Sequence, residues 1–170
     1  MARNSAVRIA CTILLVGSAA LIWAHGARPQ DTMNMDHAGM QSGAPVPAYH
    51  TKPPSGVLPD DTLPPAEFAN DPVTRNAYTL AAKIKPTLYQ MPCYCNCDRE
   101  VGHTSLLDCY RGTHAAICPI CKKELFYSYQ ERKKGKTTAQ IRAGIIRGEW
   151  SKIDLMKWTG ETAPPGGGGK

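Results

Sequence analysis

The sequence predicts an all-α fold: a small domain of about four helices arranged around a cysteine-rich loop. Three observations lead to this prediction. Apolar residues recur at helical spacing in several segments between residues 70 and 158. Capping and stop residues stand at the ends of these segments. Six of the seven cysteines fall between Cys93 and Cys121, and no run of alternating apolar and polar residues persists.

The first predicted helix begins after Asn70 or Asp71, either of which can cap it, and carries Pro72 in its first turn. Apolar residues recur along it at helical spacing: Val73, Ala77, Leu80, Ala81 and Ile84. Pro86 is predicted to stop this helix, because proline interrupts the backbone hydrogen bonds of a helix interior.

A second, short helix is predicted to carry Cys109. It follows a capping-box pattern that runs from Ser105 to Asp108, and Gly112 is its predicted stop. A third helix is predicted from Pro119 to about Lys134, because proline is favoured in a first helical turn and Gly135 follows the apolar pattern.

The fourth predicted helix begins at Thr137, which forms a capping-box pattern with Gln140. Ile141 and Ile145 lie one turn apart on it, as expected for a helix with one buried face.

Outside the helical domain, composition predicts three further segments. Residues 1–26 have a positive start and a short apolar run, which indicate a signal peptide or an N-terminal membrane anchor. Residues 27–69 are predicted to be a disordered proline-rich tether, and residues 159–170 a disordered tail. The helical domain is therefore expected at residues 70–158. The protein is expected to be exported, and to be periplasmic or extracytoplasmic and membrane-associated in a bacterium.

The formal net charge is +6. A basic chain invites a nucleic-acid function, but export and the scattered positions of the positive residues argue against it, so no nucleic-acid partner is expected. Six basic residues are predicted to form a solvated helix face: Lys122, Lys123, Arg132, Lys133, Lys134 and Lys136.

Cys93, Cys95 and Cys97 are spaced by two residues, so a helix would place Cys95 opposite the other two. An extended or looped backbone lets all three converge, and the segment is therefore predicted to be a chelating loop. Cys118 and Cys121 lie at a predicted helix start, where the helix dipole is expected to lower the pKa of Cys118.

These residues resemble a known family. The motif string is Pro92-Cys-Tyr-Cys-Asn-Cys97, Gly102-His103, Ser105-Leu106, Cys109, His114-Ala115, Cys118, Cys121 and Glu124. It resembles the exported bacterial proteins named for their PCYCGC or CYCXC motif, over about residues 78–146. Asn96 replaces the glycine of the commoner form, which costs backbone freedom but no ligand. The resemblance implies export and assigns no activity.

Eight residues are the candidate metal ligands: Cys93, Cys95, Cys97, Cys109, Cys118, Cys121, His103 and His114. Thiolates with imidazole suit zinc, and thiolate-rich loops also suit Cu(I). A first set of four draws on Cys93, Cys95, Cys118 and Cys121. Glu124 could support a ligand, but it is expected to face solvent. The alternative is that the six cysteines form disulfides, which an oxidising compartment favours.

A second copper site is predicted in the tether, where three thioethers and one imidazole lie within eight residues. Its ligands would be Met33, Met35, His37 and Met40. Thioethers prefer Cu(I), and a flexible segment can wrap the ion without a preformed fold.

The sequence therefore predicts an exported metal-binding protein for zinc or copper, with a role in binding, delivery or protection rather than catalysis. Its partners are expected to be the metal ion and a membrane or exported protein. One alternative is an extracytoplasmic thiol–disulfide redox protein that uses Cys118 and Cys121. Another is a structural module stapled by disulfides.

Overall fold

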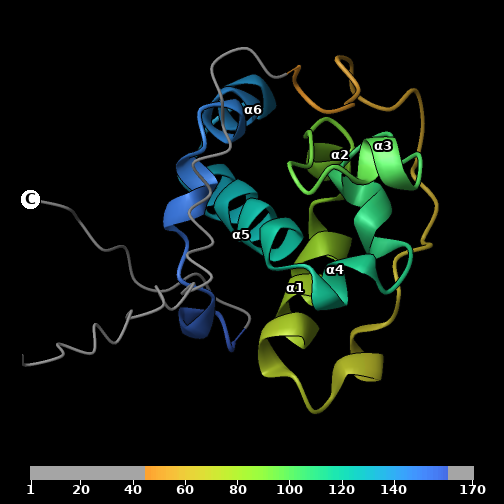
Figure 1. The fold of residues 1–170 in the computed structure, drawn as a ribbon, viewed down its shortest axis with the longest axis vertical. Coiled ribbons are helices and arrows are strands. Elements are labelled where there is room, and N and C mark those ends of the chain that lie inside the picture. Colours follow the sequence, from red (N-terminus) through yellow and green to blue (C-terminus); the bar gives the residue numbers. More distant parts are fainter. Residues whose placement is uncertain (1–44, 161–170) are drawn as a thin grey trace, which may run out of the picture. The chain divides into compact units, whose positions relative to one another are not determined.

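The computed structural model describes residues 45–160. All helices and turns in this range belong to a helical fold without strands, so the predicted all-α fold is confirmed (Figure 1). The α-helices in this part of the chain are α1 (Pro72–Lys83), α2 (Lys85–Leu88), α3 (Cys97–Glu100), α4 (His114–Ile117), α5 (Pro119–Lys133) and α6 (Thr138–Ile146). The 3₁₀ helices are η1 (Pro65–Phe68), η2 (Leu106–Tyr110), η3 (Glu149–Lys152) and η4 (Leu155–Lys157).

Several predictions concern residues outside this range. The predicted signal peptide or anchor at residues 1–26 lies outside the described residues, as does the predicted copper site of Met33, Met35, His37 and Met40. Most of the predicted tail also lies outside them. Among residues 45–160, none of the helices is both long and apolar enough to cross a membrane.

Helix α1 forms where its capping residues predicted it. The Asp71 side chain accepts the backbone N–H of Thr74 at 3.0 Å, and Pro72 occupies the first turn. The helix buries Ala77, Leu80 and Ala81 completely. It ends at Lys83, before the predicted stop at Pro86, because the chain turns at Ile84 and Pro86 lies inside the short helix α2.

Helix α5 organises the core, since it contacts α1, α2, α4 and α6 as well as η2, η3 and η4. It spans the predicted third helix almost completely, with Cys118 at its N-cap and a proline in its first turn. Leu125 and Phe126 are fully buried on it, and the Phe126 ring stacks on Trp158 with centroids 4.5 Å apart. Aromatic stacking adds to the burial of apolar area, so α5 is held by the last helical turns of the unit.

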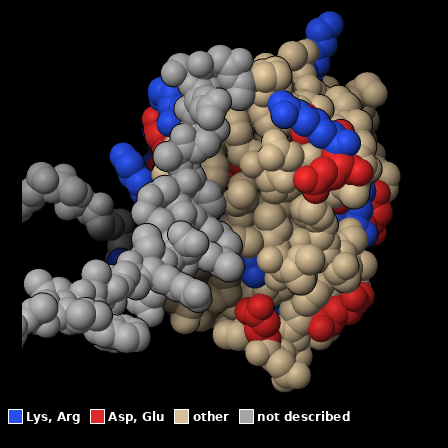
Figure 2. All heavy atoms as spheres, in the orientation of Figure 1, with Lys and Arg blue, Asp and Glu red and all other residues tan. Residues whose placement is uncertain are grey.

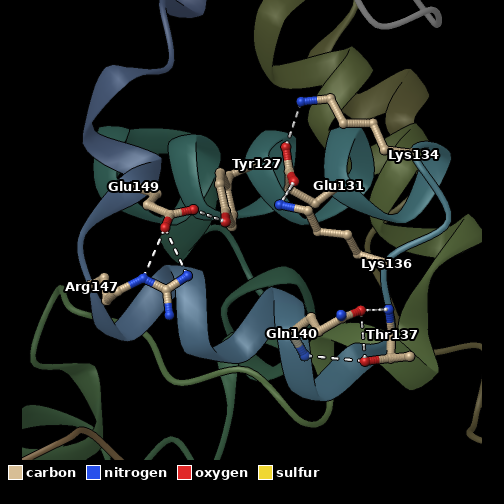
Figure 3. Close-up of polar contacts among 8 residues, drawn as sticks. All are labelled: Tyr127, Glu131, Lys134, Lys136, Thr137, Gln140, Arg147 and Glu149. Carbon is tan, nitrogen blue, oxygen red and sulfur yellow. Dashed lines mark hydrogen bonds and ion pairs between the residues drawn. The ribbon is translucent and has the colours of Figure 1, made fainter.

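Helix α6 begins with the predicted capping box: the side chains and backbones of Thr137 and Gln140 bond reciprocally (Figure 3). It packs closely on α5 at Gly144, where an added Cβ would lie 1.8 Å from Tyr127 Oη. The Tyr127 hydroxyl donates a hydrogen bond of 2.5 Å to Glu149. Gly144 therefore leaves the space that the Tyr127 hydroxyl and the Glu149 carboxylate occupy, and an added side chain would force them to move.

The predicted capping box at Ser105 does not form. The Ser105 hydroxyl has no hydrogen-bond partner, and Asp108 instead accepts the backbone N–H and the hydroxyl of Thr104, at 2.7 and 2.8 Å. The segment is the 3₁₀ helix η2 rather than an α-helix. It still carries Cys109, which is fully buried.

Part of the segment predicted as a tether, from Pro45 to Ala69, runs against the helices. The His50 ring stacks on Tyr89 with centroids 3.7 Å apart, and the Leu63 N–H donates to Tyr110 O at 3.0 Å. Phe68 in η1 stacks on Tyr78 with centroids 4.2 Å apart. Residues 45–69, which precede the predicted domain, therefore cover one side of α1 and η2.

The six basic residues from Lys122 to Lys136 do not form one solvated face as predicted. Lys122 is buried, and its ammonium donates to the Thr74 hydroxyl at 3.0 Å and to Ala116 O at 2.9 Å, which ties α5 to α1 and α4. Lys134 and Lys136 are exposed and pair with Glu131 (Figure 3). On the face shown in Figure 2, basic and acidic side chains lie near one another around a broad area of uncharged residues.

Candidate metal centre

Three segments bring the cysteines together: the loop that leads into α3, the 3₁₀ helix η2 and the start of α5. The Leu106 N–H donates to Met91 O at 2.9 Å, which ties η2 to the start of the loop. The His103 N–H donates to Cys97 O at 3.1 Å and closes the turn after α3. Asn96 turns the loop with a φ of 64°, in the left-handed region that asparagine tolerates better than most residues.

The thiols form one continuous cluster. Neighbouring Sγ atoms lie 3.2 Å apart for Cys93 and Cys95, 2.9 Å for Cys95 and Cys97, 3.4 Å for Cys97 and Cys109, and 3.5 Å for Cys93 and Cys121. A disulfide requires about 2.05 Å. All six cysteines of the described chain are free thiols. The loop therefore converges as a chelating loop would, with no covalent link between the sulfurs.

Two sets of four donors can each hold a metal ion. The first, which we call the sulfur set, consists of Cys93, Cys95, Cys97 and Cys109. The second, which we call the mixed set, consists of Cys95, Cys109, His114 and Cys121. Within each set all donor atoms lie within 4.8 Å of one another. A tetrahedral zinc–thiolate site has sulfurs about 3.8 Å apart, from a Zn–S distance of ~2.3 Å, so small movements would bring either set onto an ion.

The two histidines flank the cluster. His114 Nε2 lies 3.4 Å from Cys95 Sγ, and His103 Nδ1 lies 3.3 Å from Cys109 Sγ. The two rings meet edge to face, with centroids 5.4 Å apart. His114 belongs to the mixed set, whereas His103 belongs to neither set and contacts a thiol that both sets share. His103 is thus placed to support Cys109 from outside the donor sets.

Cys118 differs from the other five cysteines. It lies at the N-cap of α5, is partly exposed and belongs to neither set, although it neighbours Cys95 and Cys121. The first set of four expected from the sequence, which included Cys118, is therefore not one of the two sets in the structure. The predicted lowering of the pKa of Cys118 is wrong. The hydrogen bond with Cys121 lowers the pKa of Cys118, but the bond with Cys95 and burial outweigh it, and the pKa is raised.

The shared thiols are the acidic ones. Hydrogen bonds from other thiols, first that of Cys121 and then that of Cys93, lower the pKa of Cys109 to about 4. The pKa of Cys95 is also lowered, with Cys109 as the first cause. Burial raises the pKa of Cys93, and the bond with Cys109 raises that of Cys121. The pKa is thus lowered for the two thiols that the sets share and raised for the thiols around them.

Glu124 is a site residue that the sequence prediction placed wrongly in solvent. Its carboxyl is completely buried beside the Cys93 thiol, and Oε1 accepts the backbone N–H of Tyr94 at 2.8 Å. Burial raises the pKa of Glu124 well above its usual value. The sequence contains one signal that could have placed Glu124 at the site. Glu124 lies three residues after Cys121 and therefore shares its face of α5.

Comparison with known proteins finds a sequence family that matches this chain. The model of a family described as "Protein of unknown function with PCYCGC motif" matches residues 51–150. Neither the curated proteins nor the solved structures contain a match to this chain.

Proposed function

Because the chain belongs to the PCYCGC family, whose function is unknown, we propose its function from the site: it is a metal-binding protein that takes up zinc or copper. One observation carries this proposal. Two four-donor sets of cysteine and histidine converge within 4.8 Å, while all six cysteines among the described residues are free thiols. Buried thiols that only filled space would not need to bring their sulfur atoms together, since small apolar residues fill a core equally well.

The donors favour a role in binding, delivery or protection rather than catalysis. Each set supplies four protein ligands, and a closed tetrahedral site leaves no position for a substrate. Thiolate with imidazole suits zinc, and thiolate alone also suits Cu(I). Cys95 and His114 are partly exposed whereas Cys97 and Cys109 are buried, so a metal ion would reach the cluster from the side of Cys95.

We place the protein outside the cytoplasm, because residues 1–26 have the composition of a signal peptide or anchor. Six free thiols in an oxidising compartment would be open to disulfide formation. A bound metal would protect them, so export and metal binding support each other. The partner that gives or receives the metal would then be a membrane or exported protein.

The test is native mass spectrometry of the full chain, purified from the exported compartment without reductant or chelator, combined with elemental analysis. The expected result is a mass increment that matches zinc or copper. Alkylation of the denatured, unreduced protein should modify all six cysteines between Cys93 and Cys121. A metal-free mass that is short by six hydrogens would overturn the proposal and leave a disulfide framework.

A redox function is the second candidate, since Cys118 is partly exposed and lies beside Cys121 at the start of α5. A thiol that attacks disulfides needs a substantial thiolate fraction, which the raised pKa values of Cys118 and Cys121 oppose. Reduction of a model disulfide by the metal-free chain, with the Cys118→Ser variant as control, separates the two functions. Only activity that depends on Cys118 would favour the redox function.

A further inference from the structure

We propose that the cluster holds two metal ions at once, one in the sulfur set and one in the mixed set, with Cys95 and Cys109 as thiolates that bridge both ions. This inference rests on the proposed metal-binding function and adds its stoichiometry, its bridging ligands and the class of ion.

The first observation that supports the inference is the composition of the two donor sets. They share Cys95 and Cys109 and differ in one pair each, Cys93 with Cys97 in the sulfur set and His114 with Cys121 in the mixed set. Two tetrahedra that share an edge have six corners in all, two of them common. The structure supplies six donors in this arrangement, with the common pair in the middle and one terminal pair for each ion.

The distances around Cys95 agree with a bridging position. Its Sγ lies 3.2 and 2.9 Å from the terminal thiols of the sulfur set, Cys93 and Cys97. It also lies 3.6 Å from Cys121 Sγ and 3.4 Å from His114 Nε2, the terminal donors of the mixed set. A thiol that served one ion would contact the terminal donors of one set, whereas Cys95 contacts those of both.

A single ion would leave part of this cluster unused. If the sulfur set alone were filled, the fully buried thiol of Cys121 and the imidazole of His114 would point at sulfurs that already bind metal. If the mixed set alone were filled, the buried thiols of Cys93 and Cys97 would do so. Occupation of both sets gives every one of the six donors a metal.

Charge identifies the class of ion. The two sets together contain five thiolates, which carry five negative charges when metallated, and one neutral imidazole. Two divalent ions leave a net charge of minus one, whereas two monovalent ions leave minus three. Glu124 beside Cys93 brings no compensating positive charge. Since a buried net charge is unfavourable, the site is built for two divalent ions that accept tetrahedral sulfur and nitrogen ligands, the class to which zinc belongs.

The experiment uses ¹¹³Cd²⁺ as a spectroscopic substitute for such ions, added to the full chain. Native mass spectrometry should show two cadmium ions per chain. The ¹¹³Cd NMR spectrum should show two signals of equal intensity, each split by the other ion through the shared sulfurs. One bound ion, or two signals without mutual splitting, would overturn the bridged site and leave the proposed function standing. No bound ion would overturn both.

Matched variants locate the bridge. His114→Ala removes a terminal donor of the mixed set only, and we expect it to retain one cadmium ion. Cys118→Ser changes a neighbouring thiol outside both sets, and we expect it to retain two ions and their mutual splitting. Cys95→Ser removes one of the two bridges, so the splitting should change in size while Cys109 alone still joins the two ions. Far-UV circular dichroism checks that each variant keeps its helices, and an unaltered splitting in folded Cys95→Ser would contradict the assignment of this bridge.

Discussion

The carboxylate of Glu124 on α5 accepts the backbone N–H of Tyr94, the residue between the first two cysteines of the loop, at 2.8 Å. The carboxyl is completely buried, and its other oxygen, Oε2, has no hydrogen-bond partner. One residue of the central helix therefore fixes the backbone at the point where Cys93 and Cys95 must turn toward the same centre. The contact explains how a loop without strands or long helices can hold its thiols in place.

We predict that Glu124→Ala destabilises the metal-free domain by about 1–3 kcal/mol, because the partly buried Tyr94 N–H loses its acceptor. Glu124→Gln keeps an oxygen at the same place and should change the free energy of unfolding by less than about 1 kcal/mol. Urea denaturation of the metal-free variants measures both values. Equal losses in the two variants would show that the charge of Glu124, and not its hydrogen bond, stabilises the loop.

We predict that Gly144→Ala destabilises the contact between α5 and α6. The added Cβ would lie 1.8 Å from Tyr127 Oη, which is itself bonded to Glu149 (Figure 3), so the tyrosine ring must move. Overpacking of this kind costs about 1–3 kcal/mol. Thermal and urea unfolding measure the loss.

The matched control for this prediction is Gly56→Ala, since nothing lies within 4 Å of a Cβ at Gly56. Its stability should stay close to that of the parent chain. The double variant Gly144→Ala, Tyr127→Phe removes the hydroxyl that clashes most closely, and it should lose less than the two single variants added together. Additive losses would mean that Gly144 is needed for another reason.

We predict that the left-handed residue Asn96 can be replaced by glycine but not by a β-branched residue. Its φ of 64° is accessible to glycine without strain, so Asn96→Gly should leave stability and metal uptake unchanged or slightly improved. Asn96→Val should destabilise the loop by roughly 1–2 kcal/mol. Asn96 is exposed, so a loss of metal in Asn96→Val with unchanged helix content would report backbone strain rather than lost packing.

The parts of the fold that sequence predicts are those with local signals. Helices α1 and α6 are capped by Asp71 and Thr137, and α5 begins at Pro119; the capping and first-turn preferences of these residues act within a few positions. The short helices α2, α3 and α4 were not predicted, because four-residue helices do not form alone and depend on the contacts of the surrounding chain.

The same distinction applies to the site. Cysteine spacing predicts that the thiols meet, but the division into two sets depends on how η2 and α5 approach the loop, which is a tertiary property. Glu124 and Lys122 were expected in solvent because an isolated charged residue is usually exposed. Each is buried because it bonds a group far away in the chain, Tyr94 and Thr74 respectively.

Metal removal should loosen the cysteine-bearing segments before it affects the rest of the unit. Donors from three segments would be joined by the metal, and binding free energy becomes folding free energy where those segments have little other support. The helix α3 has four residues, and η2 has five. By contrast, α6 carries a complete capping box and its own packing on α5.

We therefore expect a chelator to speed amide hydrogen exchange in residues 93–110 by at least tenfold, while exchange in α6 changes much less. Hydrogen exchange followed by mass spectrometry, before and after chelation and again after the metal is restored, measures both regions in one sample. Uniform acceleration across both regions would mean that the metal stabilises the whole unit cooperatively, and an unchanged pattern would mean that the loop is held by contacts such as Glu124 with Tyr94 alone.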